Sequence, residues 1–373
     1  MAQYEIISLL GSGVFGETYK VKYKGKLYAL KRQKILKTDI NNKSTRSAVL
    51  REVNFFKWIK KLPEAEQQFF AVPEKVEYTK NCQLTETRDQ NLDPYLLKQK
   101  EVLNKSTFCI DILMDLKDGV VDDLVKLSKK ERYSICIQIL YALYLMHKNG
   151  YVHGDIHAGN IAYKKIKDTK KLTLIFGDKK IKIDSCGYQI SLIDYGFVLN
   201  RKFNLTENEM NNFNWLMDRK NDVTQLLSYL TNIDGNEHTK PCIGWRNVNH
   251  KNDRLLHKIY KQNFELYLLA KARYVDKNGQ FALSYFKLIE QDKFDKAQFD
   301  KAIKSMPFFN WFATEILVIL IIDNRLPIKD IIGCNNLKFM IDDADLKLIS
   351  SYRSVDEMYN IIKILAGKIV PIN

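Results

Sequence analysis

Three short segments near the start of the chain have the apolar pattern of β-strands. Residues 17–23 alternate with the two-residue period of a strand, residues 4–10 and 27–31 are also interpreted as strands, and a glycine-rich stretch, residues 11–16, lies between the first two. Because strands flank the glycines on both sides, we expect a β-hairpin to carry them. A dinucleotide-binding fold would instead place such glycines between a strand and a helix.

The pattern becomes helical further along the chain. Apolar spacing predicts helices at residues 48–59 and 131–147, and strands at residues 72–78 and 108–116. Between those strands, the polar residues 79–105 are interpreted as an insertion. We therefore predict an α+β fold with two lobes, a small β-rich N-terminal lobe at residues 1–116 and a larger helical C-terminal lobe at residues 117–373.

A second insertion is predicted at residues 164–190. Residues 171–176 and 180–183 flank Gly177-Asp178, a hairpin turn sequence. The chain carries a formal net charge of +15, and this segment is strongly basic. Its field could attract acidic proteins, nucleic acid or an anionic membrane, although no nucleic-acid-binding module accompanies it. The lysines of the segment are Lys164, Lys165, Lys167, Lys170, Lys171, Lys179, Lys180 and Lys182.

Composition and cysteine spacing narrow the class of protein. With 373 residues and 46% hydrophobic content, the chain suits a two-lobed enzyme better than several independent modules. The apolar run at residues 311–322 is shorter than the roughly 20 residues that span a bilayer, so we predict a buried helix and no transmembrane segment. The start of the chain shows no targeting segment, which predicts an intracellular protein. Six cysteines without a CxxC pair argue against zinc and disulfides: Cys82, Cys109, Cys136, Cys186, Cys242 and Cys334.

A lysine and a carboxylate near the N-terminus are candidates for binding phosphate. Lys31 ends the strand that follows the glycine hairpin, where its amine could reach phosphate oxygens. Glu52 lies in the predicted helix at residues 48–59 and is our choice as the acidic partner of Lys31. Glu64 and Glu66 are weaker alternatives, because they lie beside Pro63 in a predicted loop.

Two later segments supply the other groups that phosphoryl transfer requires. In the sequence HGDIHAGN at residues 153–160, Asp155 could accept the proton of an attacking hydroxyl and Asn160 could bind magnesium. In the sequence LIDYG at residues 192–196, Asp194 closes an apolar strand and could chelate the same metal. The spacing of these residues favours a catalytic site over an ordinary polar turn.

Together these motifs resemble those of the protein kinase superfamily. The resemblance implies a bilobal protein-kinase-like fold, ATP and Mg²⁺ as cofactors, with Mn²⁺ as an alternative metal, and a protein substrate. It also implies that Lys31 and Glu52 act with Asp155 in catalysis and that His157 lies near the γ-phosphate. The implied nucleotide-binding residues are Gly11, Gly13, Val14, Phe15, Gly16, Val21, Ala29, Lys31, Met114, Asp115 and Leu116.

Several positions depart from the usual protein kinase pattern. Gly154 replaces the arginine that binds a phosphorylated activation loop, Tyr195 replaces the phenylalanine of DFG, and no APE motif follows. Asp222, the candidate anchor of the next helix, comes only 28 positions after Asp194, so a broad peptide platform is not expected. The loop around His157 is similar to that of aminoglycoside and choline kinases.

The glycine loop and the Ala29-Leu30-Lys31 strand are closer to eukaryotic-type protein kinases. This combination resembles divergent kinases of large DNA viruses, which implies host cytoplasm and the virion as locations and an acidic or virion protein as partner. A serine/threonine protein kinase is the favoured function. A small-molecule phosphotransferase and a nucleotide-binding pseudokinase scaffold stay open as alternatives.

Overall fold

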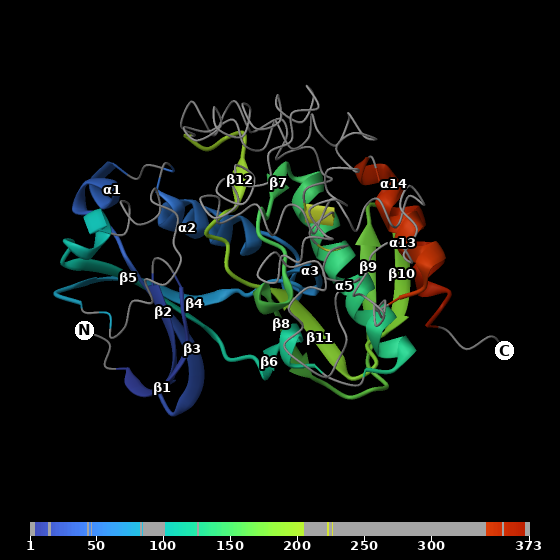
Figure 1. Cartoon of the computed structure of the whole chain (residues 1–373), viewed down its shortest axis with the longest axis horizontal. Helices are drawn as coiled ribbons and strands as arrows, with labels where there is room; N and C mark the ends of the chain where they lie inside the picture. The colour runs from blue at the N-terminus through green and yellow to red at the C-terminus, as the bar shows by residue number, and fades with distance from the viewer. Residues whose placement is uncertain are drawn as a thin grey trace, which may run out of the picture. The chain divides into compact units, whose positions relative to one another are not determined.

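The computed structural model describes the N-terminal half of the chain most fully (Figure 1). The chain divides into two compact units, one formed by residues 1–124, 133–206 and 358–373, the other by residues 125–132 and 207–357. All elements of the candidate site belong to the first unit. The described residues are 4–13, 16–42, 45, 47–82, 84, 101–124, 127–204, 222–223, 226, 341–352 and 354–369.

A five-stranded antiparallel sheet forms the N-terminal part of the first unit. Its strand order is β1-β2-β3-β5-β4, and the β1–β2 hairpin carries the glycines. This sheet, together with the helices that follow, confirms the predicted α+β class. The strands are β1 (Glu5–Ser12), β2 (Gly16–Tyr23), β3 (Lys26–Lys34), β4 (Pro73–Lys80) and β5 (Phe108–Asp115).

Strand register assigns the side chains of this sheet to two faces. Directly opposed residues point to the same side, and consecutive residues point to opposite sides. Thr18, Lys31 and Ile112 are opposed to one another, and so are Lys20, Ala29 and Met114 one step away. We call this side the Lys31 face. The other side, the Arg32 face, carries Tyr19, Val21, Leu30, Arg32, Lys34, Cys109, Asp111 and Leu113.

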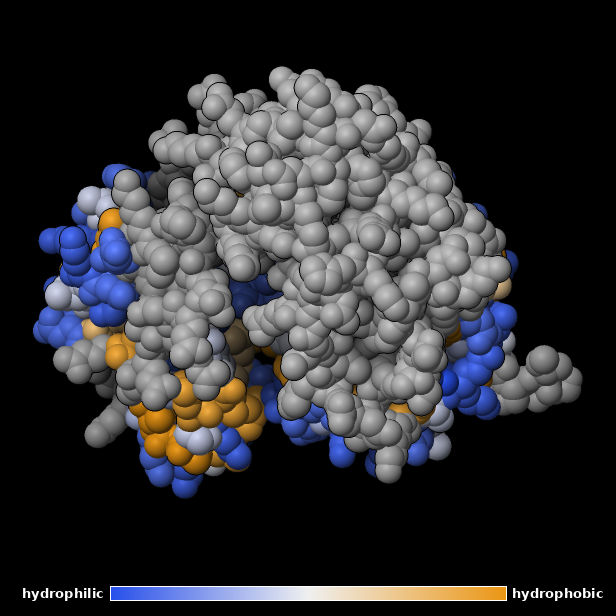
Figure 2. All heavy atoms as spheres, viewed as in Figure 1, coloured by the Kyte–Doolittle hydropathy of each residue, from blue (hydrophilic) through white to orange (hydrophobic). Residues whose placement is uncertain are grey.

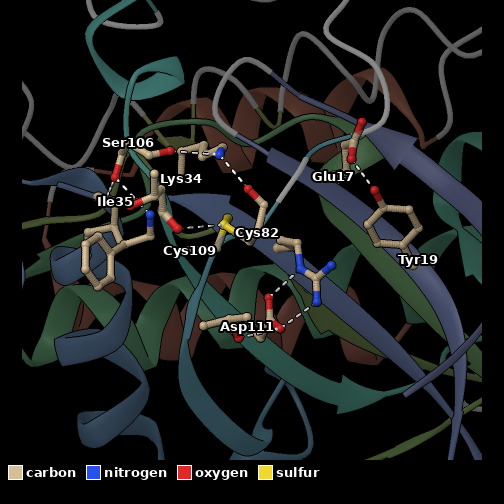
Figure 3. Close-up of a disulfide and its surroundings, with 12 residues drawn as sticks. Glu17, Tyr19, Lys34, Ile35, Cys82, Ser106, Cys109 and Asp111 are labelled. Carbon is tan, nitrogen blue, oxygen red and sulfur yellow. Dashed lines mark hydrogen bonds and ion pairs between the residues drawn. A yellow bond between two sulfur atoms is a disulfide. The ribbon is translucent and has the colours of Figure 1, made fainter. Parts of the chain in front are cut away.

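The Arg32 face is cross-linked and buried (Figure 3). Tyr19, Val21, Leu30 and Leu113 form one apolar cluster. Beside it, the Arg32 guanidinium donates two hydrogen bonds of 2.7 Å to the Asp111 carboxylate, which raise the pKa of the guanidinium. Thr79 also donates to Asp111, at 3.0 Å.

A disulfide joins Cys82 and Cys109 on the same face, with their Cα atoms 6.0 Å apart. Free thiols were predicted, and for this pair the prediction was wrong. Spacing along the chain could not show that β4–β5 pairing brings the end of one strand beside the start of the other. Lys34 donates hydrogen bonds of 2.8 and 2.9 Å to the carbonyls of Cys82 and Ser106, so both ends of the intervening segment are fixed to β3. Cys136 and Cys186 are not part of a disulfide.

Helices follow the third strand, and α2 packs its apolar side inward. These are α1 (Lys37–Asn42), α2 (Ala48–Ile59) and the short α3 (Glu64–Gln67). Helix α2 has the predicted bounds and buries Leu50, Phe55, Phe56 and Ile59. Glu64 and Glu66 were predicted to lie in a loop but belong to α3. Pro63 lies directly before this helix, and a proline at the start of a helix does not prevent it from forming.

The remaining elements of the first unit surround a long buried helix, α5 (Lys129–Lys148). Two small antiparallel sheets, β11-β8-β6 and β12-β7, hold the segments that contain Asp155 and Asp194. Their elements are β6 (Gly119–Val120), η1 (Val121–Asp123), β7 (Tyr151–Val152), η2 (Ala158–Asn160), β8 (Ile161–Lys165), β11 (Tyr188–Leu192) and β12 (Leu199–Asn200).

The basic segment predicted at residues 164–190 contains a two-stranded hairpin, β9 (Lys171–Phe176) and β10 (Lys179–Asp184). The first two and last three residues of the segment belong to β8 and β11, the strands on either side of this hairpin. The C-terminal helices are α13 (Asp343–Ser350) and α14 (Val355–Ala366). The buried helix predicted at residues 311–322 and most of the insertion predicted at residues 79–105 lie outside the described residues.

Candidate active site

The centre of the site is an ion-pair cluster that joins strand β3, helix α2 and the end of β11. The Lys31 amine lies 2.9 and 3.0 Å from the two carboxylate oxygens of Glu52 and 2.9 Å from Oδ1 of Asp194. The Glu52 side chain is 1% exposed, whereas that of Asp194 is 47% exposed. The cluster therefore has one enclosed carboxylate and one that reaches solvent.

Burial and charge act against each other in this cluster. Burial lowers the pKa of Lys31, but the charges of Asp194 and Glu52 outweigh burial and raise it. Burial raises the pKa of Glu52 in spite of Lys31. Burial also raises the pKa of Asp194, but the charge of Lys31 outweighs burial and the pKa is lowered. Lys31 is thus held as an ammonium and Asp194 as a carboxylate, the charge states needed to bind phosphate and metal.

The backbone at Asp194 has a turn that places its carboxylate beside Lys31. Asp194 has φ 57°, in the left-handed region that few residues other than glycine enter. The Gly196 N–H donates to Oδ1 of Asp194 at 3.3 Å, and the Tyr195 N–H donates to Glu52 at 3.3 Å. Glu52 therefore contacts both the lysine and the turn that holds the aspartate.

Tyr195 fixes the other side of this turn. Its ring is fully buried among Phe55, Phe56 and His153. Its hydroxyl donates to the carbonyl of Leu192 and accepts from the Ala71 N–H at 3.0 Å. A phenylalanine could fill the same space but could not make these hydrogen bonds. The sequence identified Tyr195 as a replacement for phenylalanine and did not show a use for its hydroxyl.

Asp155 and Asn160 form a second group, on the loop between β7 and β8. The Asn160 amide donates to the Asp155 backbone carbonyl at 3.0 Å and to Asp155 Oδ2 at 2.9 Å. Among the described residues, no hydrogen-bond donor contacts Asp155 Oδ1 or Asn160 Oδ1. The loop thus leaves one carboxylate oxygen free to accept a proton and one amide oxygen free to bind a cation.

His157 lies beside this pair. Its Nδ1 accepts a hydrogen bond from the Gly159 N–H at 3.1 Å, and its Nε2 is 3.6 Å from Asp155 Oδ2. Burial lowers the pKa of His157, but Asp155 outweighs burial and leaves the pKa raised. Gly154 has φ +80°, and a Cβ there would lie 2.8 Å from the Phe197 carbonyl oxygen. This loop therefore excludes a side chain at that position unless Phe197 moves.

The three glycines of the glycine loop have different surroundings. A Cβ at Gly16 would lie 2.2 Å from the Arg32 carbonyl oxygen, so this glycine allows β2 to approach β3. Among the described residues, no atom lies within 4 Å of such a Cβ at Gly11, and the nearest atom to one at Gly13 is 3.9 Å away. The first two glycines thus leave space beside the backbone. Val14 and Phe15 lie outside the described residues.

One predicted nucleotide-binding residue faces the wrong way. Val21 is fully buried on the Arg32 face, against Tyr19 and Leu30, and cannot line a site that contains Lys31. Thr18 takes that place, because it lies directly opposite Lys31. Its position two residues after Gly16, with the alternation of β2, could have identified it from the sequence.

Ala29 and Met114 lie directly opposite each other on the Lys31 face. The Asp115 side chain, at the end of β5, belongs to the other face, and its carboxylate lies 3.5 Å from the Lys164 amine and 3.7 Å from the Lys117 amine. Leu116 follows the strand and is partly buried. Beyond β5, backbone groups rather than the Asp115 side chain are therefore available to a ligand on the Lys31 face.

The metal-binding chemistry of the site fits magnesium with phosphate better than a metal held by protein alone. Within the described parts of the chain, no three His, Cys, Asp or Glu side chains are grouped to hold a metal ion. Magnesium is commonly bound by one or two carboxylates plus phosphate oxygens and waters. Asp194 and Asn160 provide such a partial set of ligands.

No helix in the described ranges is long and apolar enough to cross a membrane.

Part of the chain matches a known protein family. Residues 4–195 match the family described as protein tyrosine and serine/threonine kinase. This match covers more than half of the chain and extends from β1 to the residue after Asp194. A solved crystal structure of a kinase domain is similar with a TM-score of 0.48 and 15% sequence identity, over 96% of this chain and 94% of that chain. No curated protein matches the chain.

Proposed function

The chain belongs to the protein tyrosine and serine/threonine kinase family, and from this premise we propose that it is an active serine/threonine protein kinase that transfers the γ-phosphate of ATP to protein hydroxyls. The observation that carries the proposal is the Lys31 amine bound to both Glu52 and Asp194. A scaffold that had lost catalysis would not need a buried carboxylate to hold this lysine beside a half-exposed aspartate.

The cofactors that the family implies are ATP and Mg²⁺, with Mn²⁺ as an alternative, and the residues present fit them. Lys31 would hold phosphate oxygens, while Asp194 and the free Oδ1 of Asn160 would hold the metal. When bound, the metal neutralises charge on the phosphates. Gly11 and Gly13 would let backbone N–H groups approach those phosphates, and Ala29, Met114 and Thr18 would line the nucleotide side of the sheet.

Asp155 is the proposed catalytic base. Asn160 holds its Oδ2 atom, and Oδ1 is left to accept the proton of an acceptor hydroxyl. His157 is the proposed contact to the transferred phosphate or the acceptor, which the 3.6 Å distance from its Nε2 to Asp155 Oδ2 supports. Glu52 does not touch the reacting atoms in this arrangement and acts by positioning Lys31.

A small-molecule phosphotransferase is the second candidate function. The observation that favours it is His157 next to Asp155, in a loop that resembles those of aminoglycoside and choline kinases. The glycine loop and the Lys31 strand support the protein kinase, and we give them more weight because they are closer to eukaryotic-type protein kinases than to small-molecule kinases. The resemblance to kinases of large DNA viruses supports a further proposal, that the acceptor is an acidic or virion protein in the host cytoplasm or the virion.

The test is transfer of labelled γ-phosphate from magnesium-ATP to casein, myelin basic protein and the enzyme itself, by wild type and Asp155→Asn. We expect labelled protein with wild type and a loss of about 100-fold or more with the variant. Nucleotide binding should be kept, since Asp155 holds neither phosphate nor metal. Label on aminoglycosides or choline alone would establish the second candidate. No label on any acceptor, with ATP still bound, would indicate a scaffold.

A further inference from the structure

The β9–β10 hairpin is not needed to connect the strands on either side of it. Strands β8 and β11 pair from Ile161↔Leu192 to Lys165↔Tyr188, and the Ile166 N–H extends the ladder with a 2.9 Å hydrogen bond to the Gly187 carbonyl. A turn of two residues would close such an antiparallel pair. The chain instead leaves this ladder and returns to it only after a complete second hairpin.

One face of the hairpin is anchored to the body of the unit. Leu172, Leu174 and Ile183 are at most 1% exposed. The Phe176 ring contacts Tyr141 and Tyr144 of α5, and the Tyr141 hydroxyl accepts from the Ile175 N–H at 2.8 Å and donates to the Ile175 carbonyl at 3.1 Å. The hairpin is therefore a fixed platform whose other face has a defined geometry.

That other face is exposed and basic. Register places Lys171, Thr173, Lys180, Lys182 and Asp184 on it, together with Ile175. Asp184 is paired with Lys171 at 2.9 Å. Lys180 and Lys182 are exposed, and among the described residues neither has an ion-pair partner. Two unneutralised lysines thus stand two residues apart on one strand, about 7 Å from each other.

We propose that this lysine face of the β9–β10 hairpin docks an extended acidic segment of the protein acceptor. An extended peptide with acidic residues at alternate positions presents carboxylates at the same spacing of about 7 Å. Nucleic acid is the less suitable partner, because Thr173 and Ile175 stand opposite Lys182 and Lys180 and register places no aromatic ring on this face for a base to stack on. The inference rests on the proposed protein kinase function.

The test compares Lys180→Gln/Lys182→Gln with a control that removes two charges elsewhere, Lys60→Gln/Lys61→Gln, in the exposed turn after α2. The hairpin variant should raise the KM for dephosphorylated casein, an acidic acceptor, about threefold to tenfold with kcat unchanged. The KM for myelin basic protein should not change. The control variant should match wild type on both acceptors.

Direct binding separates this inference from the proposed function. A fluorescein-labelled peptide of alternating glutamate and serine, without ATP, should bind wild type with an affinity that falls as salt rises and should bind the hairpin variant several-fold more weakly. Equal binding by wild type and both variants would overturn the docking proposal even if kinase activity is present. Loss of affinity for a single-stranded oligonucleotide but not for the peptide would also overturn it and assign the face to nucleic acid.

Discussion

The two faces of the N-terminal sheet use neighbouring residues for opposite purposes. On the Lys31 face, a lysine that is 12% exposed reaches an aspartate that is 47% exposed, and two glycines leave open backbone. On the Arg32 face, an arginine that is 17% exposed is paired with an aspartate that is 2% exposed, beside an apolar cluster and a disulfide. Figure 2 shows the apolar surface that remains over β1–β3 in orange, with exposed residues Ile6, Ile7, Leu9, Leu10 and Leu27.

The difference shows that an ion pair does not reveal its role by its residue types. Lys31 and Arg32 are consecutive, and both bind carboxylates at hydrogen-bond distance. Register places the Lys31 side chain on the face that can receive a ligand. The Arg32 side chain lies on the opposite face, where Arg32 and Asp111 bind each other and neither of them can exchange this contact for a ligand. Lys31 should therefore matter for transfer and Arg32 for folding.

The largest expected effect is on transfer. Lys31→Met removes the cation that holds phosphate while keeping the length of the side chain. We expect the rate of phosphoryl transfer to fall about 100-fold to 1000-fold, as when one preorganised donor is lost. Thermal unfolding should show a folded protein. An unchanged rate would mean that phosphate does not contact Lys31.

On the opposite face, Arg32→Met should cost stability rather than activity. It leaves the Asp111 carboxylate buried with Thr79 as its remaining hydrogen-bond donor among the described side chains, and breaking a buried pair typically costs about 3 kcal/mol or more. Urea unfolding should show the loss, while the rate per folded molecule stays within about twofold of wild type. Lys57→Met, an exposed lysine on α2, is the control for removal of a positive charge.

Loss of the disulfide should act in the same direction as Arg32→Met. Cys82→Ser/Cys109→Ser opens a loop with a sequence separation of 27, which should lower the free energy of unfolding by about 3 kcal/mol under oxidising conditions. In excess dithiothreitol the variant and wild type should become similar in stability. A stability difference that persists in reductant would assign the effect to packing instead of the cross-link.

Substitutions at Val21 and Thr18 test the assignment of the two faces. Val21→Thr buries a hydroxyl in an apolar cluster and should cost about 1–3 kcal/mol of stability with little change in the KM for ATP. Thr18→Val should leave stability within about 0.5 kcal/mol and change the KM for ATP instead. If Val21→Thr were the variant that altered the KM for ATP, the register argument would fail.

The smallest expected effect is that of Tyr195→Phe, which keeps the ring and removes the two hydrogen bonds to Leu192 and Ala71. We expect a loss of about 1 kcal/mol of stability. Because the hydroxyl positions the Asp194 turn, the KM for magnesium should rise more than the KM for the protein acceptor. Equal changes in both constants would indicate general loosening of the fold.

Local patterns in the sequence were sufficient to predict much of this arrangement. Glycines between two alternating segments predicted the hairpin, and the apolar face of α2 directed attention to Glu52, which the structure places against Lys31. Lys31, Asp155, Asn160 and Asp194 were named because phosphoryl transfer requires a cation, a base and metal ligands.

The features that could not be predicted from the sequence depend on strand register and on contacts between distant segments. Val21 was assigned to the nucleotide side because its residue type fitted, whereas the pairing of β2 with β3 decides its face. The Cys82–Cys109 cross-link and the Tyr195 bond to Ala71 each join positions that only the fold brings together. No local pattern marks such pairs.

The most direct test of this account measures, side by side, the rate of γ-phosphate transfer to casein per folded molecule for Lys31→Met and Arg32→Met. The account predicts at least about a 100-fold lower rate for Lys31→Met and a rate within about twofold of wild type for Arg32→Met. Equal rates for the two variants would contradict it, because the Lys31 face would then not have a role in phosphoryl transfer that the Arg32 face lacks.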